Sequence, residues 1–272
     1  MKYVKMHGAG NEFILIEAIR SGALPRELSG LPELARRLCS PETGPGADGL
    51  VLLLPAKEPE ADFRMLFLNS DGTPGEMCGN AARCVCRFGA DRGLAKDPQN
   101  IRIETTAGPI SGKKLSEDRY EVRLNDPTCI DLHRAAEAGG KQYDCAYVEL
   151  GDPGIPHAVL LAPPDGNLGR ELRFSPAFLK GANVSFVAVT GANEAEAVTY
   201  ERGVEGFTKA CGTGCGSIAA ALTLLGIFTP GEICIRMPGG DLSIRLTNDG
   251  GKITDIFLTG PAEYISEHEN NC

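Results

Sequence analysis

The feature that constrains this chain most is an internal repeat with a spacing of about half its 272 residues. In each half, a strand-like run leads through a glycine-bearing loop to a Cys-Gly pair, then to a helix and a further strand. The matched positions are Asn69 and Arg202, 133 residues apart, Cys78 and Cys211, 133 apart, and Ile101 and Ile233, 132 apart. A constant offset of this kind indicates a duplication, and it predicts two similar α/β domains that face each other.

The secondary-structure pattern is the same in both halves. Period-two alternation predicts half-buried antiparallel strands at 101–106, 120–124, 233–237 and 242–246. The uncharged stretch 210–231 is interrupted by four glycines before its final Pro-Gly pair, which favours a buried core helix over a membrane span.

The charge balance excludes some classes of partner. The net charge is −9, and the Lys and Arg residues are scattered, so the chain has no basic patch for nucleic acid or an anionic membrane. The first residues lack the apolar run of a signal peptide, which predicts a cytoplasmic protein. We therefore expect a small-molecule partner.

The ten cysteines suggest neither disulfides nor a metal site. A cytosolic setting keeps thiols reduced, no pair has the C-x-x-C spacing, and only four histidines are present. We expect most cysteines to be buried apolar groups and no metal to be bound.

Cys78 and Cys211 are the exceptions, because each stands where an alanine-rich helix begins. A helix N-terminus presents backbone N–H groups and a positive dipole end, so it lowers a thiol pKa and binds an anion such as a carboxylate. Two such thiols on opposite faces of one α-carbon could invert it, one as base and one as acid, without any cofactor. The duplication would bring both helix starts to one interdomain cleft.

Two other interpretations of the thiols stay open. A buried cysteine at a helix start often serves only packing, and Cys84, Cys86, Cys215 and Cys234 fit that role. Two facing activated thiols could also form a redox pair. The duplicated Cys-Gly-(Asn/Thr) context favours acid/base work, because a redox pair needs no equivalence between its thiols.

Motifs over nearly the whole chain resemble the diaminopimelate epimerase family. They are 5–13 (KMHGAGNEF), 44–49 (GPGADG), 67–72 (FLNSDG), 76–80 (EMCGN), 156–157 (PH), 183–184 (NV), 200–203 (YERG) and 210–214 (ACGTG). The resemblance implies an enzyme that interconverts LL- and meso-diaminopimelate for lysine and cell-wall synthesis without pyridoxal phosphate.

The resemblance also implies an architecture. It predicts an α/β fold of the α+β type with two pseudo-symmetric domains, each a mostly antiparallel sheet around a central helix. The first domain would span 1–118, with 262–272 packing back on it, and the second 119–261. Members of the family often form homodimers.

Carried over position by position, the resemblance assigns the site. Cys78 and Cys211 would be the catalytic base and acid, and His157 and Glu201 would tune the thiol pKa values. The substrate would be bound by Asn11, Asn69, Gly79, Asn80, Asn183, Glu201, Arg202, Gly212 and Thr213.

Without the resemblance, the sequence gives weaker support to the residues assigned to the far end of the substrate and to His157. Asn11, directly after Gly10, and Asn183, two residues after Gly181, fit turns. Glu201 and Arg202 fit a solvated pair, and His157 fits a core position. An Arg nevertheless suits a carboxylate, and a nearby Glu suits an ammonium.

One position departs from the family pattern. The family usually reads Gly-Asn-Pro-His, whereas this chain has Ile155 in place of the Asn. This leaves open a related racemase for another amino acid, such as histidine, and more remotely a thiol redox or binding protein of the same fold.

Overall fold

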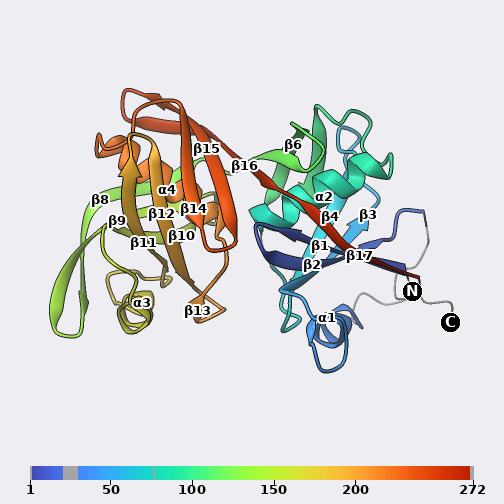
Figure 1. The fold of residues 1–272 in the computed structure, drawn as a ribbon, viewed down its shortest axis with the longest axis horizontal. Coiled ribbons are helices and arrows are strands. Elements are labelled where there is room, and N and C mark those ends of the chain that lie inside the picture. Colours follow the sequence, from blue (N-terminus) through green and yellow to red (C-terminus); the bar gives the residue numbers. More distant parts are fainter. Residues whose placement is uncertain (1, 21–29, 76, 270–272) are drawn as a thin grey trace. The chain divides into compact units, whose positions relative to one another are not determined.

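The computed structural model describes residues 2–20, 30–75 and 77–269 (Figure 1). The chain divides into two compact units, Met1–Val122 together with Gly260–Cys272, and Arg123–Thr259. Glu76, in the motif before Cys78, and residues 270–272 of the C-terminal segment lie outside the described residues. The domain boundaries expected at 118/119 and 261/262 stay a prediction, because compactness alone does not show that either unit folds by itself.

The first unit is a sheet with two helices. Its strands are β1 (Lys2–Gly8), β2 (Asn11–Glu17), β3 (Gly49–Leu54), β4 (Phe63–Asn69), β5 (Ile101–Thr105), β6 (Gly108–Lys114), β7 (Arg119–Arg123) and β17 (Glu263–Glu269), and its helices are α1 (Leu31–Cys39) and α2 (Gly79–Asp91). The order of the strands is β17-β1-β2-β3-β4-β5-β6-β7, in which β2–β3 and β4–β5 are parallel and the other pairs are antiparallel.

The second unit has the same plan. Its strands are β8 (Pro127–Ala138), β9 (Lys141–Leu150), β10 (Ile155–Leu160), β11 (Asn183–Gly191), β12 (Glu194–Glu201), β13 (Gly206–Phe207), β14 (Glu232–Met237), β15 (Gly240–Asp249) and β16 (Lys252–Pro261), and its helices are α3 (Gly166–Arg173) and α4 (Gly212–Leu224). The order is β8-β9-β10-β11-β12-β14-β15-β16, with β10–β11 and β12–β14 parallel and the others antiparallel.

The two strand orders match pair by pair, from β17 with β8 to β7 with β16. Each parallel pair of one sheet has a parallel pair at the same place in the other, and α1 and α2 correspond to α3 and α4. The topology agrees with the duplication predicted from the 133-residue spacing. The mostly antiparallel α/β architecture expected from the sequence is confirmed.

The second helix of each unit lies in the core of its own sheet. Helix α2 contacts β1, β2 and β6, and α4 contacts β8, β9, β10, β11 and β15. The residues of α4 from Gly214 to Thr223 are all buried, as expected for a helix that is apolar on every side. The predicted buried helix is therefore confirmed, and no helix among the described residues is long and apolar enough to cross a membrane.

The first helix of each unit covers the sheet through a single apolar stripe. Leu31, Ala35 and Leu38 of α1 pack on a cluster that includes Ile14 and Leu52 from the neighbouring strands. Every residue of β3 is buried, which explains why its sequence is a continuous apolar run rather than an alternating one. This packing fixes the strand ends from which the site residues extend.

Candidate active site

Cys78 and Cys211 occupy the same structural position. Each is the N-cap of a 13-residue helix, with φ and ψ of −130° and 112° at Cys78 and −121° and 102° at Cys211. In each helix the first intrahelical hydrogen bond ends on the cysteine carbonyl, from Ala82 N at 2.9 Å and from Cys215 N at 2.9 Å. The following N–H groups, at Gly79–Asn80 and Gly212–Thr213, therefore belong to the first turn, where an α-helix offers donors to an anion.

In the first unit, Asn80 connects the helix start to the hairpin of β1 and β2. Its Nδ2 lies 3.4 Å from Asn11 Oδ1, and only 2% of the residue is exposed. Asn11 begins β2 directly after a two-residue turn in which Ala9 and Gly10 have φ of 50° and 81°. A Cβ at Gly8 would stand 2.7 Å from the Asn80 carbonyl oxygen, so only glycine allows the hairpin to lie this close to α2.

Arg83 holds the first turn of α2 from within the core. The residue is fully buried, and its Nη2 donates to Asn80 Oδ1 at 2.8 Å. Its Nη1 donates to Gly79 O at 3.2 Å, and its Nε donates to Pro261 O at 3.3 Å. The guanidinium thus ties Gly79 and Asn80 to Pro261, in the segment from Gly260 onward that belongs to the first unit.

Asn69 lies at the end of β4 and is held by the turn that follows. Its Nδ2 donates to Thr73 Oγ1 at 3.0 Å, and the Thr73 hydroxyl donates to Asp71 at 2.6 Å. Half-buried in this turn, Asn69 keeps a fixed direction at the strand end.

In the second unit, Cys211 is buried, with 5% of the residue exposed. Burial raises the pKa of its thiol well above the ordinary value, the carboxylate of Glu201 adds to this, and hydrogen bonds from Gly214 and Thr213 partly oppose it. The expectation that the helix start brings the pKa of both thiols toward neutrality is therefore wrong for Cys211. The loss of solvation and a nearby negative charge outweigh the helix end.

His157 reaches Cys211 through Thr213. Its Nε2 lies 3.0 Å from Thr213 Oγ1, which in turn lies 3.8 Å from Cys211 Sγ. His157 is fully buried, and burial together with the charge of Arg202 lowers its pKa to about 3. The imidazole is therefore neutral at physiological pH.

Glu201 is the last residue of β12, beside the strand that begins with Asn183, and Arg202 follows it. Asn183 Oδ1 accepts from Arg202 N at 2.8 Å, and its Nδ2 donates to Pro156 O at 3.2 Å. Glu201 Oε1 accepts from the Thr208 hydroxyl at 2.5 Å. The side-chain amide of Asn183 is thus bonded to backbone groups through both its oxygen and its nitrogen.

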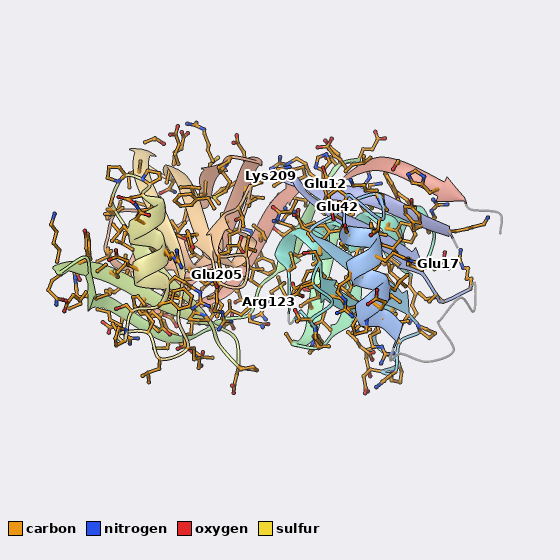
Figure 2. All side chains as sticks on the ribbon, turned by 90° about the horizontal axis from the view of Figure 1, so that it is seen from below. Glu12, Glu17, Glu42, Arg123, Glu205 and Lys209 are labelled. Carbon is orange, nitrogen blue, oxygen red and sulfur yellow. The ribbon has the colours of Figure 1, made fainter. Side chains whose placement is uncertain are left out.

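The Arg202 side chain is anchored at one point. Its Nη1 donates to Lys180 O at 3.2 Å, and the side chain stays half-exposed. Glu205, in the turn after Arg202, accepts from Gly203 N at 3.0 Å and pairs with Arg173 at 3.0 Å (Figure 2). The turn that carries the guanidinium is therefore fixed.

Ile155 begins β10, two residues before His157. It is half-buried and pairs with Leu150 of the neighbouring strand. An apolar side chain therefore stands at the position where the family pattern has an amide.

The structure brings the predicted residues together as two clusters, one in each unit. Asn11, Gly79 and Asn80 gather at Cys78, whereas Asn69, at the end of β4, is bonded to Thr73 of its own turn. The second cluster contains Cys211, Gly212, Thr213, His157, Asn183, Glu201 and Arg202.

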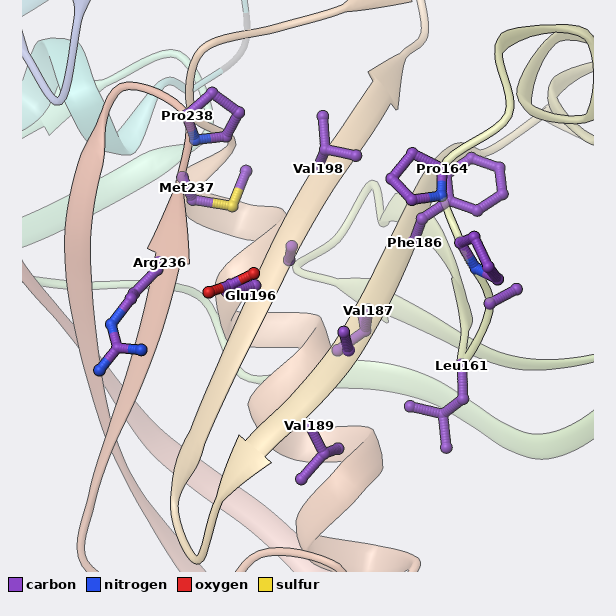
Figure 3. Close-up of a pocket in the computed structure, with 14 residues that line it drawn as sticks. Leu161, Pro164, Phe186, Val187, Val189, Glu196, Val198, Arg236, Met237 and Pro238 are labelled. Atoms are coloured by element: carbon purple, nitrogen blue, oxygen red, sulfur yellow. The ribbon is translucent and has the colours of Figure 1, made fainter.

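A separate apolar pocket of about 860 Å³ lies elsewhere in the second unit (Figure 3). Its lining comes from 161–164, 186–189, 196–198 and 236–238, and none of the predicted site residues belongs to it. Glu196 and Arg236 are its ionisable groups, so the pocket offers no thiol chemistry.

Three residues of the clusters were not anticipated. Arg83, Thr208 and Lys180 hold Asn80, Glu201 and Arg202 respectively. Only Arg83 left a sequence signal, as a single charge inside the apolar run from Ala81 to Cys86. The other two contacts depend on loops whose paths the sequence does not fix.

Comparison with known proteins identifies the same family as the sequence motifs do. The profile of the family described as diaminopimelate epimerase matches residues 3–128 and 153–265. The diaminopimelate epimerase of Pelotomaculum thermopropionicum is 35% identical to this chain, over 99% of the chain and 98% of the relative.

Solved structures share the fold at lower identity. A hydroxyproline epimerase from Agrobacterium vitis is 20% identical with a TM-score of 0.70, covering 98% of this chain and 91% of its own. A phenazine biosynthesis protein of the PhzF family from Bacillus anthracis is 14% identical with a TM-score of 0.74, covering 100% and 99%. With the profile match and the full-length relatives, the resemblance seen in the sequence motifs is confirmed: the chain belongs to the diaminopimelate epimerase family.

Proposed function

We propose that this protein is an isomerase that interconverts LL- and meso-diaminopimelate by proton transfer between Cys78, Cys211 and the α-carbon. The observation that carries the proposal is the equivalence of the two cysteines. Each is the N-cap of the buried helix of its unit, with nearly the same backbone conformation. A reaction that treats the two faces of one carbon alike needs two equivalent proton carriers.

In this mechanism the α-carboxylate is bound by the first N–H groups of both helices. The donors would be Gly79 and Asn80 from α2, and Gly212 and Thr213 from α4. They would stabilise the negative charge that spreads onto the carboxylate when the α-proton leaves. One cysteine thiolate takes that proton, and the other cysteine thiol delivers a proton to the opposite face, so that the two ionisation states are exchanged after each turnover.

The surroundings of Cys211 suit it to the role of proton donor when the other thiol is ionised. Burial and Glu201 raise the pKa of its thiol, which keeps it protonated. With His157 Nε2 protonated, the imidazole donates to Thr213 Oγ1, whose own hydroxyl then donates to Cys211 Sγ. His157 and Glu201 would thus tune the thiol in opposite directions.

The distal end of the substrate would be bound by the remaining predicted residues. Arg202 is suited to the far carboxylate and Glu201 to the far ammonium. Asn183 fixes the Arg202 backbone, and Asn11 and Asn69 would add amide contacts from the first unit.

Ile155 favours a second candidate, a racemase of an amino acid without a distal carboxylate, such as histidine. An apolar side chain at this point cannot replace an amide hydrogen bond, and it suits a less polar substrate. The loss of one neutral hydrogen bond costs about 0.5–1.5 kcal/mol, or at most roughly tenfold in affinity. We therefore keep diaminopimelate as the first candidate.

The proposal includes no cofactor, a cytoplasmic location and a homodimer. Reducing conditions would keep both thiols active. The family resemblance supports the dimer, and light scattering at micromolar concentration tests it.

We predict that Cys78→Ala and Cys211→Ala each lower epimerisation of LL-diaminopimelate by about 10²- to 10⁴-fold, because each change removes the proton carrier of one face. The circular dichroism of the substrate measures the rate of epimerisation, and the circular dichroism of each variant protein checks that it is folded. Cys84→Ala is the matched control, since burial raises the pKa of Cys84 to about 12 and makes it a packing group. Near-normal activity in either test variant contradicts the two-thiol mechanism.

A second prediction separates the two substrates. Arg202→Ala should reduce kcat/KM for diaminopimelate by more than tenfold, because it removes a charged contact, whereas Ile155→Asn should raise it modestly. Arg170→Ala, at an exposed arginine of the same unit, is the control. Racemisation of histidine without turnover of LL-diaminopimelate would instead identify the second candidate.

A third prediction concerns pH. Burial depresses the pKa of His157 to about 3, below the roughly 6.5 of an unfolded chain, so the unfolded state binds one more proton between these values. The free energy of unfolding therefore falls as pH decreases through this window, by at most about 1.4 kcal/mol per pH unit from this group. In urea unfolding between pH 6.5 and 4.5, His157→Gln should make the free energy of unfolding depend less steeply on pH.

His133→Gln is the control for this measurement, because His133 is an exposed histidine of the same unit. It separates the effect of a buried imidazole from the loss of any imidazole. Equal pH slopes for wild type and His157→Gln contradict a neutral, buried His157.

A further inference from the structure

The residues around Cys78 and those around Cys211 form two half-sites, one in each unit. In each half-site a buried basic side chain contacts the second residue of the helix, but the two basic side chains differ in charge. In the second unit His157 holds Thr213, the second residue of α4, with Nε2 at 3.0 Å from its hydroxyl. In the first unit Arg83 holds Asn80, the second residue of α2, with Nη2 at 2.8 Å from its amide oxygen. Both basic residues are fully buried, but only the guanidinium is charged at neutral pH.

The repeat supplies an internal comparison. At the 133-residue spacing, Arg83 corresponds to Gly216. A Cβ at Gly216 would meet side-chain carbons of Leu124, Leu150 and Ile256 at 2.9 to 3.4 Å, so the equivalent place in the second unit is apolar. Within the part of the chain that the structure describes, the helix position that holds this buried cation beside Cys78 holds no cation beside Cys211.

Arg83 also folds back toward the helix start. Its Nη1 donates to the carbonyl of Gly79, the residue next to Cys78. Its charge already acts on thiols of this helix, because it opposes the effect of burial on the pKa of Cys84. At Cys211 the nearby charge has the opposite sign, since Glu201 raises the pKa of that thiol.

Several ionisable groups on α2 and on the strands around it lie close to one another in pairs. Lys5 of β1 pairs with Glu12 of β2 at 2.6 Å. His7 lies 3.9 Å from Glu263, and Lys114 lies 3.9 Å from Asp91. These groups are partly exposed, whereas Arg83 is fully buried within the first turns of α2.

We infer that Arg83 is a positioning residue of the Cys78 half-site, where it fixes Gly79 and Asn80 for carboxylate binding and makes Cys78 the thiolate of the resting enzyme. Cys211 is then the cysteine that is protonated in the resting enzyme. The inference deepens the proposed function and rests on it for the carboxylate. The effect on Cys78 does not depend on turnover, because it concerns the thiol itself.

Alkylation of the intact protein by iodoacetamide at pH 7, with the modified cysteine identified by peptide mass spectrometry, tests the charge effect. Arg83→Met should slow the alkylation of Cys78 about tenfold, because a nearby cation lowers a thiol pKa by about one unit or more. Arg87→Met is the matched control. Arg87 lies one turn further along α2 and donates to Ala262 O at 2.7 Å, next to the carbonyl that Arg83 contacts.

Arg83→Lys tests the positioning effect and carries the test if Arg83→Met does not fold. It keeps the cation but cannot reproduce three fixed hydrogen bonds. Cys78 alkylation should then stay within about threefold of wild type, whereas kcat/KM for LL-diaminopimelate should fall about tenfold or more.

Two results overturn the inference. One is an unchanged rate of Cys78 alkylation in a folded Arg83→Met protein, and the other is a wild-type kcat/KM in Arg83→Lys. If the wild-type protein does not turn over diaminopimelate, the proposed function fails, but the alkylation rates still decide whether Arg83 controls Cys78.

Discussion

The burial of one helix inside each sheet is the constraint on which both half-sites depend. Helices α2 and α4 are packed by strands of their own units, and nearly every residue of their first three turns is buried. A helix held in this way cannot rotate or slide without exposing apolar surface or creating voids. Its N-cap is therefore fixed, and the cysteine at that N-cap has a defined direction.

The two helices place their N-cap cysteines in equivalent positions, but the groups around the two cysteines differ in charge. The Cys78 half-site contains the buried guanidinium of Arg83, whereas the Cys211 half-site contains a neutral His157 and the carboxylate of Glu201. In the proposed mechanism this difference would favour one resting arrangement, with the proton on Cys211, whereas two interacting thiols in equal surroundings would share that proton equally. In that mechanism the duplication would supply the two proton carriers, and the neighbouring residues would set their ionisation.

Much of this organisation could be predicted from the sequence. The 133-residue spacing predicted the repeat, and period-two alternation located the strands at 101–105 and 232–237 within a residue of their observed bounds. These signals are local or periodic, so they survive in the sequence. The helix starts at Cys78 and Cys211 were visible for the same reason.

The parts that escaped prediction depend on burial and on contacts between distant segments. The direction of the Cys211 pKa follows from how deeply the thiol is buried, which no local pattern reports. The side-chain amide of Asn183 is hydrogen-bonded to the backbone of Pro156 and of Arg202. The guanidinium of Arg83 donates to the carbonyl of Pro261, 178 residues away. Such partners become known only when the strands are placed.

In the proposed mechanism, two different groups transfer the proton on the two faces of the α-carbon. The most direct test is to incubate LL-diaminopimelate with the protein in D₂O and to analyse both stereoisomers by mass spectrometry at low conversion. Two thiols predict that the meso product carries one deuterium at the inverted carbon, while the remaining LL substrate carries none. Deuterium in the recovered LL substrate, or retained protium in the meso product, would show that a single group serves both faces.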